Sequence, residues 1–329
     1  MIFNKISVCL FSKNPEQDSF LKVIQGLKFQ SLPTDKWNIK IIDNDSDESI
    51  ERSYSGHFAF HPDVKFIAEK KRGLFFAQQC AVRSGDGDLI VILGDDCVLE
   101  RDYLEKALDY MNSHPETGYM VGNHVLKIDE NSKESEKYLL KLLYHADCHP
   151  EIFVQAVDAK RYTPAIRGSC GAVITREIAG RFTANDFYVD LLNLLRKYGI
   201  DKLRGTDLDL PMISLSIGRK IVMSSELCYV DIENSRGVNF GAYIERIVEE
   251  GFFNELFEHR WSWTSDSALS NIYYSGLGVY RAGKIAGKVN LAIRLLGAMK
   301  FYYLTARDKD IAFINKKIAA HFKKDKELK

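Results

Sequence analysis

Residues 89–93 are five consecutive apolar residues, Leu-Ile-Val-Ile-Leu, and two adjacent carboxylates follow them after one glycine. An apolar run of this length and β-branched content is typical of a strand that is buried on both faces of a sheet. Such strands belong to layered α/β domains, in which helices cover both faces. We therefore expect Asp95 and Asp96 at the carboxyl end of a central strand, which is where ligands bind in open α/β sheets.

The rest of the first half of the chain alternates between predicted strands and predicted helices, as a layered α/β domain requires. Further short β-rich runs predict strands at residues 6–11, 39–42 and 64–67. Apolar residues at helical spacing predict helices in the intervals, at residues 20–27, 74–81 and 103–111. The sequence therefore predicts a series of strands and helices with a largely parallel sheet.

The pattern changes in the second half. Strands are predicted at residues 167–174 and 220–223, helices at residues 189–195 and 208–217, and a mainly helical region from about residue 235. We therefore predict a catalytic α/β domain over residues 1–235 and a helical, basic C-terminal region over residues 236–329.

The sequence also indicates where in the cell the protein is located. No run of about twenty apolar residues occurs, and Asn4 and Lys5 interrupt the apolar start, so neither a membrane-spanning helix nor a signal peptide is expected. The six cysteines are scattered without a CxxC pair, which indicates reduced structural thiols. We expect a cytoplasmic protein.

The net charge is zero, but residues 281–329 contain thirteen Lys and Arg against four Asp and Glu. Such asymmetry predicts contact with a polyanion, for example an anionic lipid surface. Apolar residues recur there at near-helical spacing, namely Ile285, Val289, Leu296, Met299 and Tyr303. This stripe fits either an interfacial helix, which would make the protein peripheral on the inner face of a membrane, or a helix docked on the catalytic domain.

Acidic residues follow three of the predicted elements. Asp95 and Asp96 would repel each other unless a cation lies beside them, and their hard oxygens suit Mg²⁺ or Mn²⁺ bridging a diphosphate. A solvated turn, with Asp96 capping the helix near Asp102, is the alternative. Asp43 could accept hydrogen bonds from a base or ribose, or form an Asx turn. Asp207 could cap a helix or act as a general base.

The order and spacing of these motifs resemble the family 2 glycosyltransferases of the GT-A fold, over residues 5–236. The turn Phe11-Ser12-Lys13-Asn14 resembles the end of the first strand in that family. Its nucleoside-binding turn is similar to Asp43-Asn44-Asp45-Ser46, and its metal motif is similar to Gly94-Asp95-Asp96.

Two further segments resemble family motifs but depart from them. Residues 73–79 resemble the Gly-x-x-x-Ala-Arg-Asn helix, with Gln78 and Gln79 in place of Arg-Asn. Residues 206–210 resemble the Glu-Asp-x-Asp-Leu catalytic element, with Thr206 in place of Glu, and Gly94 replaces the first acid of the metal motif. These departures leave open a catalytically silent nucleotide-binding module.

A metal-dependent nucleotidyltransferase is the other alternative, but no Gly-rich, Lys/Arg-bearing loop for a triphosphate follows the first strand. The resemblance implies an inverting enzyme that transfers a sugar from a nucleotide diphosphate, UDP being the favoured carrier, to an acceptor hydroxyl. The acceptor would be a glycan or a lipid-linked molecule in the synthesis of cell-surface polysaccharide. No nucleic-acid partner is expected.

The resemblance also assigns roles to individual residues. It implies Mn²⁺ or Mg²⁺ bound by Asp96, and Asp207 as the catalytic base. The nucleotide would lie in a half formed by about residues 1–125, with contacts from Ser12, Asn14, Asp43, Arg72, Gly73 and Asp95. The acceptor would lie in a half formed by about residues 160–235, where sugar contacts are expected from Gly171, Asp209 and Arg236.

Overall fold

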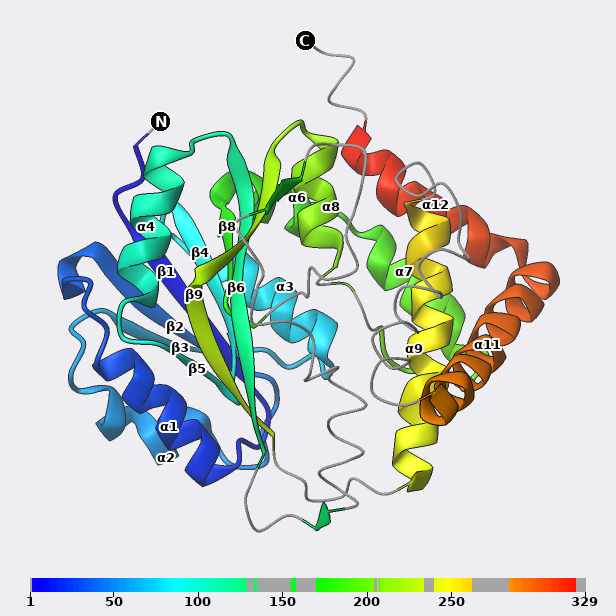
Figure 1. The fold of residues 1–329 in the computed structure, drawn as a ribbon, viewed down its shortest axis with the longest axis horizontal. Coiled ribbons are helices and arrows are strands. Elements are labelled where there is room, and N and C mark those ends of the chain that lie inside the picture. Colours follow the sequence, from blue (N-terminus) through cyan, green and yellow to red (C-terminus); the bar gives the residue numbers. More distant parts are fainter. Residues whose placement is uncertain are drawn as a thin grey trace.

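The computed structural model describes residues 2–128, 133–134, 155–157, 170–203, 206, 208–233, 240–261 and 284–323. These residues form a nine-stranded mixed sheet between layers of helices, with further helices beside one end of the sheet (Figure 1). The strand order is β3-β2-β1-β4-β8-β6-β9-β5, and β7 pairs with β9. The α/β class expected from the sequence is confirmed.

The parallel half of the sheet has the order β3-β2-β1-β4. Its strands are β1 (Ile6–Ser12), β2 (Trp37–Asp43), β3 (Val64–Ala68) and β4 (Leu89–Gly94), and they confirm the four strands predicted from apolar runs. In the parallel register, Ser12 pairs with Asp43, and Phe11 pairs with Gly94. The carboxyl ends of β1, β2 and β4 therefore meet at one edge of the sheet.

The other half of the sheet is mixed and was only partly predicted. It contains β5 (Cys97–Leu99), β6 (Thr117–Ile128), β7 (Gln155–Val157), β8 (Ala172–Thr175) and β9 (Lys220–Glu233). The sequence predicted the beginning of β9 but not β6, because β6 includes two glycines that weaken a strand pattern. Gly122 lies at a register shift between β6 and β9, where an added Cβ would meet the backbone carbonyl of Leu227.

Helices cover both faces of the sheet (Figure 1). They are α1 (Gln17–Lys28), α2 (Ile50–Tyr54), α3 (Leu74–Ser84), α4 (Tyr103–Ser113), α6 (Arg176–Thr183), α7 (Phe187–Arg196) and α8 (Asp209–Ser216). Helix α1 begins after Glu16, whose carboxylate accepts a hydrogen bond from the Ser19 N–H, and it ends at Lys28 with a basic residue in its last turn. Its buried side consists of Ser19 and the four apolar residues that gave the helical spacing.

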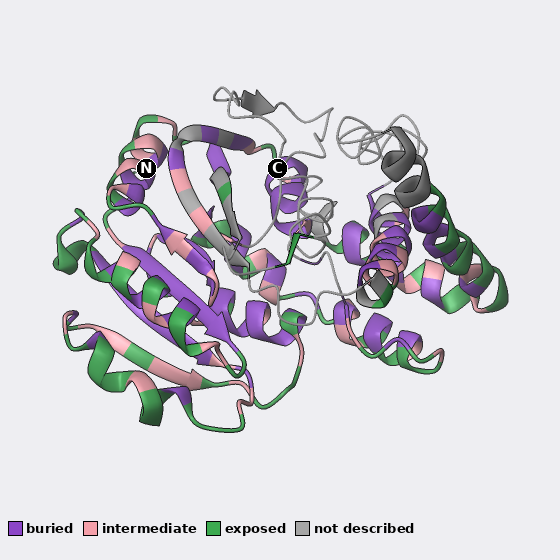
Figure 2. Cartoon of the chain, turned by 60° about the horizontal axis from the view of Figure 1, so that its bottom comes forward, coloured by how far each residue is buried: buried purple, intermediate pink, exposed green. Residues whose placement is uncertain are grey.

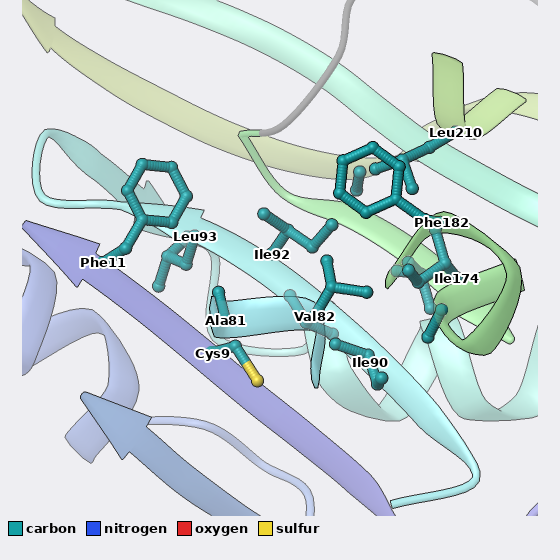
Figure 3. Packing of buried hydrophobic residues seen from close by; sticks show 14 of the residues in the cluster. Cys9, Phe11, Ala81, Val82, Ile90, Ile92, Leu93, Ile174, Phe182 and Leu210 are labelled. Carbon is teal, nitrogen blue, oxygen red and sulfur yellow. The ribbon is translucent and has the colours of Figure 1, made fainter. Parts of the chain in front are cut away.

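The core lies on both faces of β1 and β4, every residue of which is buried. On the face shown in Figure 3, Ile90 and Ile92 of β4 lie beside Val82 of α3 and Phe182 of α6. Helix α3 and helix α6 therefore pack on this face of the central strands.

The C-terminal region is helical, as predicted. Its described helices are α9 (Phe240–Arg260), α11 (Lys284–Arg307) and α12 (Lys309–Lys323). Helices α9 and α11 approach at backbone contact, because a Cβ added at Gly251 would collide with the Arg294 carbonyl and one at Gly297 with the Val248 carbonyl. None of the described helices combines the length and apolar character needed to cross a membrane.

One buried carboxylate joins the C-terminal helices to the sheet domain. Asp209 is the first residue of α8, is 0% exposed, and accepts hydrogen bonds from the Tyr188 hydroxyl (2.7 Å), the Arg260 guanidinium and the Trp261 indole. Arg260 Nε also donates to the Asn315 side chain on α12 at 3.0 Å. Burial raises the pKa of Asp209, and the Arg260 charge opposes that shift. Helices α7, α8, α9 and α12 thus share one polar network.

We expect Arg260→Ala to lower the free energy of unfolding by about 3–5 kcal/mol, because it leaves the Asp209 charge buried without its cation. The matched control is Arg219→Ala, which removes an ion pair with Glu177 in which both side chains are partly exposed. That change should cost at most about 1 kcal/mol. Urea denaturation of both variants checks the prediction, and equal losses would contradict it.

Candidate active site

The loops that follow β1, β2 and β4 are joined at the carboxyl edge of the sheet. The Ser12 hydroxyl, at the end of β1, donates a hydrogen bond to the carboxylate of Asp95, which directly follows β4. The Asn44 N–H, directly after β2, donates to the Ser12 carbonyl at 2.8 Å. The edge predicted from the acidic motifs therefore exists, and Ser12 connects its two sides.

Two residues at this edge have a left-handed backbone. Asn14 (φ 50°) follows β1 and Asp45 (φ 60°) follows β2, and they are the only non-glycine residues with positive φ among those the structure describes. Asn14 Nδ2 donates to Asp47 at 3.0 Å, and Asn14 Oδ1 accepts from the Asp47 N–H at 2.8 Å. Such conformations cluster where a loop is held for binding.

Asp43 ends β2 and organises the turn after it. Its two carboxylate oxygens accept hydrogen bonds from the Ser46 N–H (3.0 Å) and the Ile50 N–H (3.1 Å). Asp43 therefore does stabilise the turn after β2, which was one of the two roles that the sequence left open for it. Because each carboxylate oxygen can accept a second hydrogen bond, the expected contact with a nucleoside is compatible with this turn and stays a prediction.

Asn44, for which the sequence predicted no role, holds the loop before α3. Its side chain is 3% exposed, donates to the Lys71 carbonyl at 2.7 Å, and accepts from the Gly73 N–H at 2.9 Å. Gly73 has φ 124°, a conformation that glycine adopts without strain. The neighbouring Arg72 forms an ion pair with Asp45. Two of the expected nucleotide contacts, Arg72 and Gly73, are thereby placed at this edge.

The adjacent carboxylates after β4 perturb each other. Burial, followed by the charge of Asp95, raises the pKa of Asp96 to about 6. Burial also raises the pKa of Asp95, against the hydrogen bond from Ser12. The Cys170 thiol lies 3.9 Å from Asp96 Oδ1 and donates to it. Asp96 comes before β5, so it does not cap α4, which begins at Tyr103.

Gly94 has a structural reason to lack a side chain. An added Cβ would lie 2.8 Å from Asp96 Oδ1 and 3.2 Å from Cys170 Sγ. Glycine thus leaves room for the Asp96 carboxylate to fold back beside the strand end. Gly171 also lies at this edge, with φ 69°, and its N–H donates to the Ile92 carbonyl at 2.9 Å.

The structure brings together two residues that depart from the family pattern. Gln78 on α3 and Thr206 are both 2% exposed, and the Thr206 hydroxyl donates to Gln78 Oε1 at 3.1 Å. Gln78 Nε2 has no hydrogen-bond acceptor among the described residues. Position 206 precedes the expected base, so α3 is in contact with the start of the predicted catalytic element.

Three of the expected residues are not placed at the edge described above. Asp207 and Arg236 lie outside the described residues, so their roles stay predictions. Asp209 is in the core, where Tyr188, Arg260 and Trp261 bind its carboxylate. Its position indicates a packing role, and the sugar contact expected of it has no support from this geometry.

Comparisons with solved structures show the same fold. The S. aureus TarS fragment 1–349 in complex with UDP has a TM-score of 0.52 and 12% identity, over 98% of this chain and 92% of that one. A longer TarS chain has a TM-score of 0.53 and 12% identity; the match covers 84% of this chain but spans only 43% of TarS. The mannosyltransferase PcManGT from Pyrobaculum calidifontis, in complex with GDP-Man and Mn²⁺, has a TM-score of 0.53 and 14% identity, over 98% and 85% of the two chains.

No curated protein sequence matches the chain. The family described as glycosyl transferase family 2 matches residues 7–178, which include β1, β2 and β4 with the loops that form the edge. Because this match covers more than half of the chain, the protein belongs to glycosyl transferase family 2 and is a glycosyltransferase with the GT-A fold.

Proposed function

We propose that this enzyme transfers a sugar from UDP to a hydroxyl of a glycan or lipid-linked acceptor, with inversion at the anomeric carbon, in cell-surface polysaccharide synthesis. The observation that carries the proposal is the edge at which Ser12, Asp43 and Asp95 meet, with Asp96 beside them. It has the form of a nucleotide-diphosphate site: polar loop residues after β1 and β2, and paired acids after β4. UDP is present in the TarS complex, although PcManGT is in complex with GDP-Man.

The acidic pair fits a divalent cation. Two neighbouring carboxylates whose pKa values are both raised are stabilised when a cation neutralises them. In the described part of the chain, no group of three or more His, Cys, Asp or Glu side chains has an arrangement that could hold a metal ion by itself. This fits Mn²⁺ or Mg²⁺ held by Asp96 together with the donor phosphates, since such ions are bound at nucleotide sites through one or two carboxylates. When bound, the cation would stabilise the negative charge that develops on the diphosphate.

The acceptor hydroxyl requires a base, because it is a poor nucleophile at neutral pH. We assign this role to Asp207, which takes the hydroxyl proton as the acceptor oxygen bonds to the anomeric carbon. The bond from that carbon to the phosphate oxygen breaks with its electron pair, and UDP leaves. One displacement inverts the configuration, so no carboxylate nucleophile is needed.

The departures from the family motif fit an active enzyme. Where the family has Arg and Glu, this chain has Gln78 and Thr206, and the two form a neutral hydrogen bond in the core. If only one of the two positions had changed, a charged side chain would be buried without a partner. Such a change destabilises a protein by about 3–5 kcal/mol. The two departures therefore compensate each other electrostatically and need not remove the catalytic element.

The direct test is release of free nucleoside diphosphate from a panel of UDP-, GDP- and dTDP-sugars, with Mn²⁺, with Mg²⁺ and with EDTA. The proposal expects release from a UDP-sugar that depends on the cation. Release from GDP-sugars alone would correct the donor, and the absence of release from every donor, with and without glycan acceptors, would contradict transfer.

Asp96→Asn should stabilise the cation-free protein at pH 7. The folded-state pKa of Asp96 is raised from 3.8 to about 6, so the folded protein binds more protons than the unfolded chain between these values. Stability due to this group therefore falls as the pH rises from about 4 to 6, by at most about 3 kcal/mol. Melting temperatures at pH 4.5 and pH 7 in EDTA should show a larger gain for the variant at pH 7 than at pH 4.5.

The same variant should lose the stabilisation that Mn²⁺ and UDP together give to the wild type, because a ligand that binds only the folded state raises its melting temperature. Equal stabilisation of wild type and Asp96→Asn by Mn²⁺ and UDP would remove Asp96 from the metal site.

Asp207→Asn should reduce transfer by about 10²- to 10⁴-fold at saturating donor and acceptor, the usual contribution of a positioned acid–base group. Donor binding and the melting temperature should stay close to those of the wild type, because asparagine caps a helix about as well as aspartate. A variant that transfers at the wild-type rate would show that Asp207 is a cap and not the base.

Gln78→Arg and Thr206→Glu should each destabilise the protein by about 3 kcal/mol, since each buries a charge without a partner. The double variant should recover at least about 1 kcal/mol of the summed loss, because the two charges then pair. Urea denaturation gives the coupling energy. The control cycle pairs Thr206→Glu with Gln79→Arg, at a position that is only partly buried, and should show no coupling.

A further inference from the structure

Helix α11 presents a row of large apolar side chains to solvent. Of the ten large apolar residues that are exposed in the described part of the chain, five lie within nine residues of this helix. We call them the α11 face: Leu295, Leu296, Met299, Tyr302 and Tyr303. Met299 is 66% exposed and Tyr303 is 61% exposed. Exposed apolar side chains gathered on one helix indicate an interaction surface.

The helix is held so that this face cannot turn inward. Its other side is buried, with Phe301 and Leu304 each at most 4% exposed. Arg294 on that side forms an ion pair with Glu250 of α9 at 2.8 Å. Gly297 meets the α9 backbone so closely that any side chain there would collide with it. Figure 2 shows the resulting pattern, buried residues toward α9 and exposed residues on the outer side of α11.

The charges carried by α11 itself have one sign, and the Glu255 carboxylate of α9, which accepts a hydrogen bond from the Tyr302 hydroxyl at 2.7 Å, is buried. Lys300 and Arg307 are exposed on α11, and an Arg307 guanidinium N–H donates to the Tyr303 hydroxyl at 3.3 Å. Helix α11 contains no Asp or Glu. Residues 284–323 contain nine Lys and Arg against two Asp. The surface therefore offers apolar, aromatic and cationic groups together.

We propose that the α11 face docks on a bilayer surface rich in anionic phospholipid. An interfacial helix buries its apolar side chains by about 5–10 Å among headgroups and acyl chains, while Lys and Arg beside them contact lipid phosphates. Tyrosine favours that boundary, because its ring is apolar and its hydroxyl is polar. The chemistry of the α11 face matches each of these requirements.

A second copy of the chain fits the face less well. A two-fold contact through it would bring Lys300 and Arg307 of both copies into one interface, and α11 supplies no carboxylate to pair with them. Like charges placed together without partners oppose association. Anionic lipid neutralises the same charges, which is why the proposal names the bilayer.

Docking through α11 also leaves the opposite end of the molecule away from the lipid. Helices α1 and α2 lie at the other end of the long axis (Figure 1). They supply matched control positions, because Phe29 at the end of α1 is 56% exposed and Lys28 and Lys36 are exposed as well.

The test is co-sedimentation of the full chain with vesicles of phosphatidylcholine alone or with about one third phosphatidylglycerol. The wild type should sediment with the anionic vesicles at low salt and much less with the neutral ones. The triple variant Leu296→Ser, Met299→Ser, Tyr303→Ser should bind at least tenfold more weakly, whereas Phe29→Ser should bind like the wild type.

Charge reversal tests the electrostatic part separately. Lys300→Glu with Arg307→Glu should weaken binding to anionic vesicles by more than about 25-fold, since each basic residue near such a surface contributes about fivefold. The control pair, Lys28→Glu with Lys36→Glu, should have little effect on vesicle binding. These residues lie at the opposite end of the molecule, farther from the docked membrane than the Debye length.

Wild-type protein that stays in the supernatant with anionic vesicles, or α11 variants that bind as well as the wild type, would overturn the proposal. So would a wild-type oligomer, measured by sedimentation velocity, that the triple variant converts to a monomer, because the face would then join copies of the chain. None of these measurements uses a nucleotide sugar, so their outcome is independent of the proposed transfer reaction.

Discussion

The parallel register of β1 with β2 and β4 is the constraint on which the candidate active site depends. Because Ser12 pairs with Asp43 and Phe11 with Gly94, three loops leave the sheet at the same level. The Ser12–Asp95 hydrogen bond, the Asn44 contacts and the strained turns at Asn14 and Asp45 all follow from that alignment. A slip by one residue would turn every side chain of a strand to its other face and would take Ser12 out of line with Asp43.

The C-terminal helices also hold the segment that contains the predicted base. Asp209 is two residues after Asp207 in the sequence, and its carboxylate is bound by Arg260 and Trp261 at the end of α9. The same Arg260 contacts Asn315 of α12. The start of α8 is therefore fixed by helices beyond the span of the family match, which ends at residue 178.

Much of the fold and part of the site could be predicted from local patterns. The apolar runs gave the four parallel strands, because an apolar segment of five or six residues bounded by polar turns has few alternatives. The same reasoning put Asp43, Asp95 and Asp96 at strand ends. It did not find Asn44 or Cys170, since an amide in a turn and a single thiol have no distinctive spacing, and it missed β6, whose pairing with β9 is made about one hundred residues away.

The sequence by itself determined the periodicities: which segments are strands, which are helices, and that acids follow β2 and β4. The tertiary structure decided which partners those residues meet. Asp209 looked like a site residue beside Asp207, but Arg260, 51 residues later, draws it into the core. The apolar residues of α11 fitted either docking or exposure, and the glycine contact with α9 determined that Met299 and Tyr303 face outward. Periodicity records which residues share a face, whereas packing between distant segments sets which face is covered.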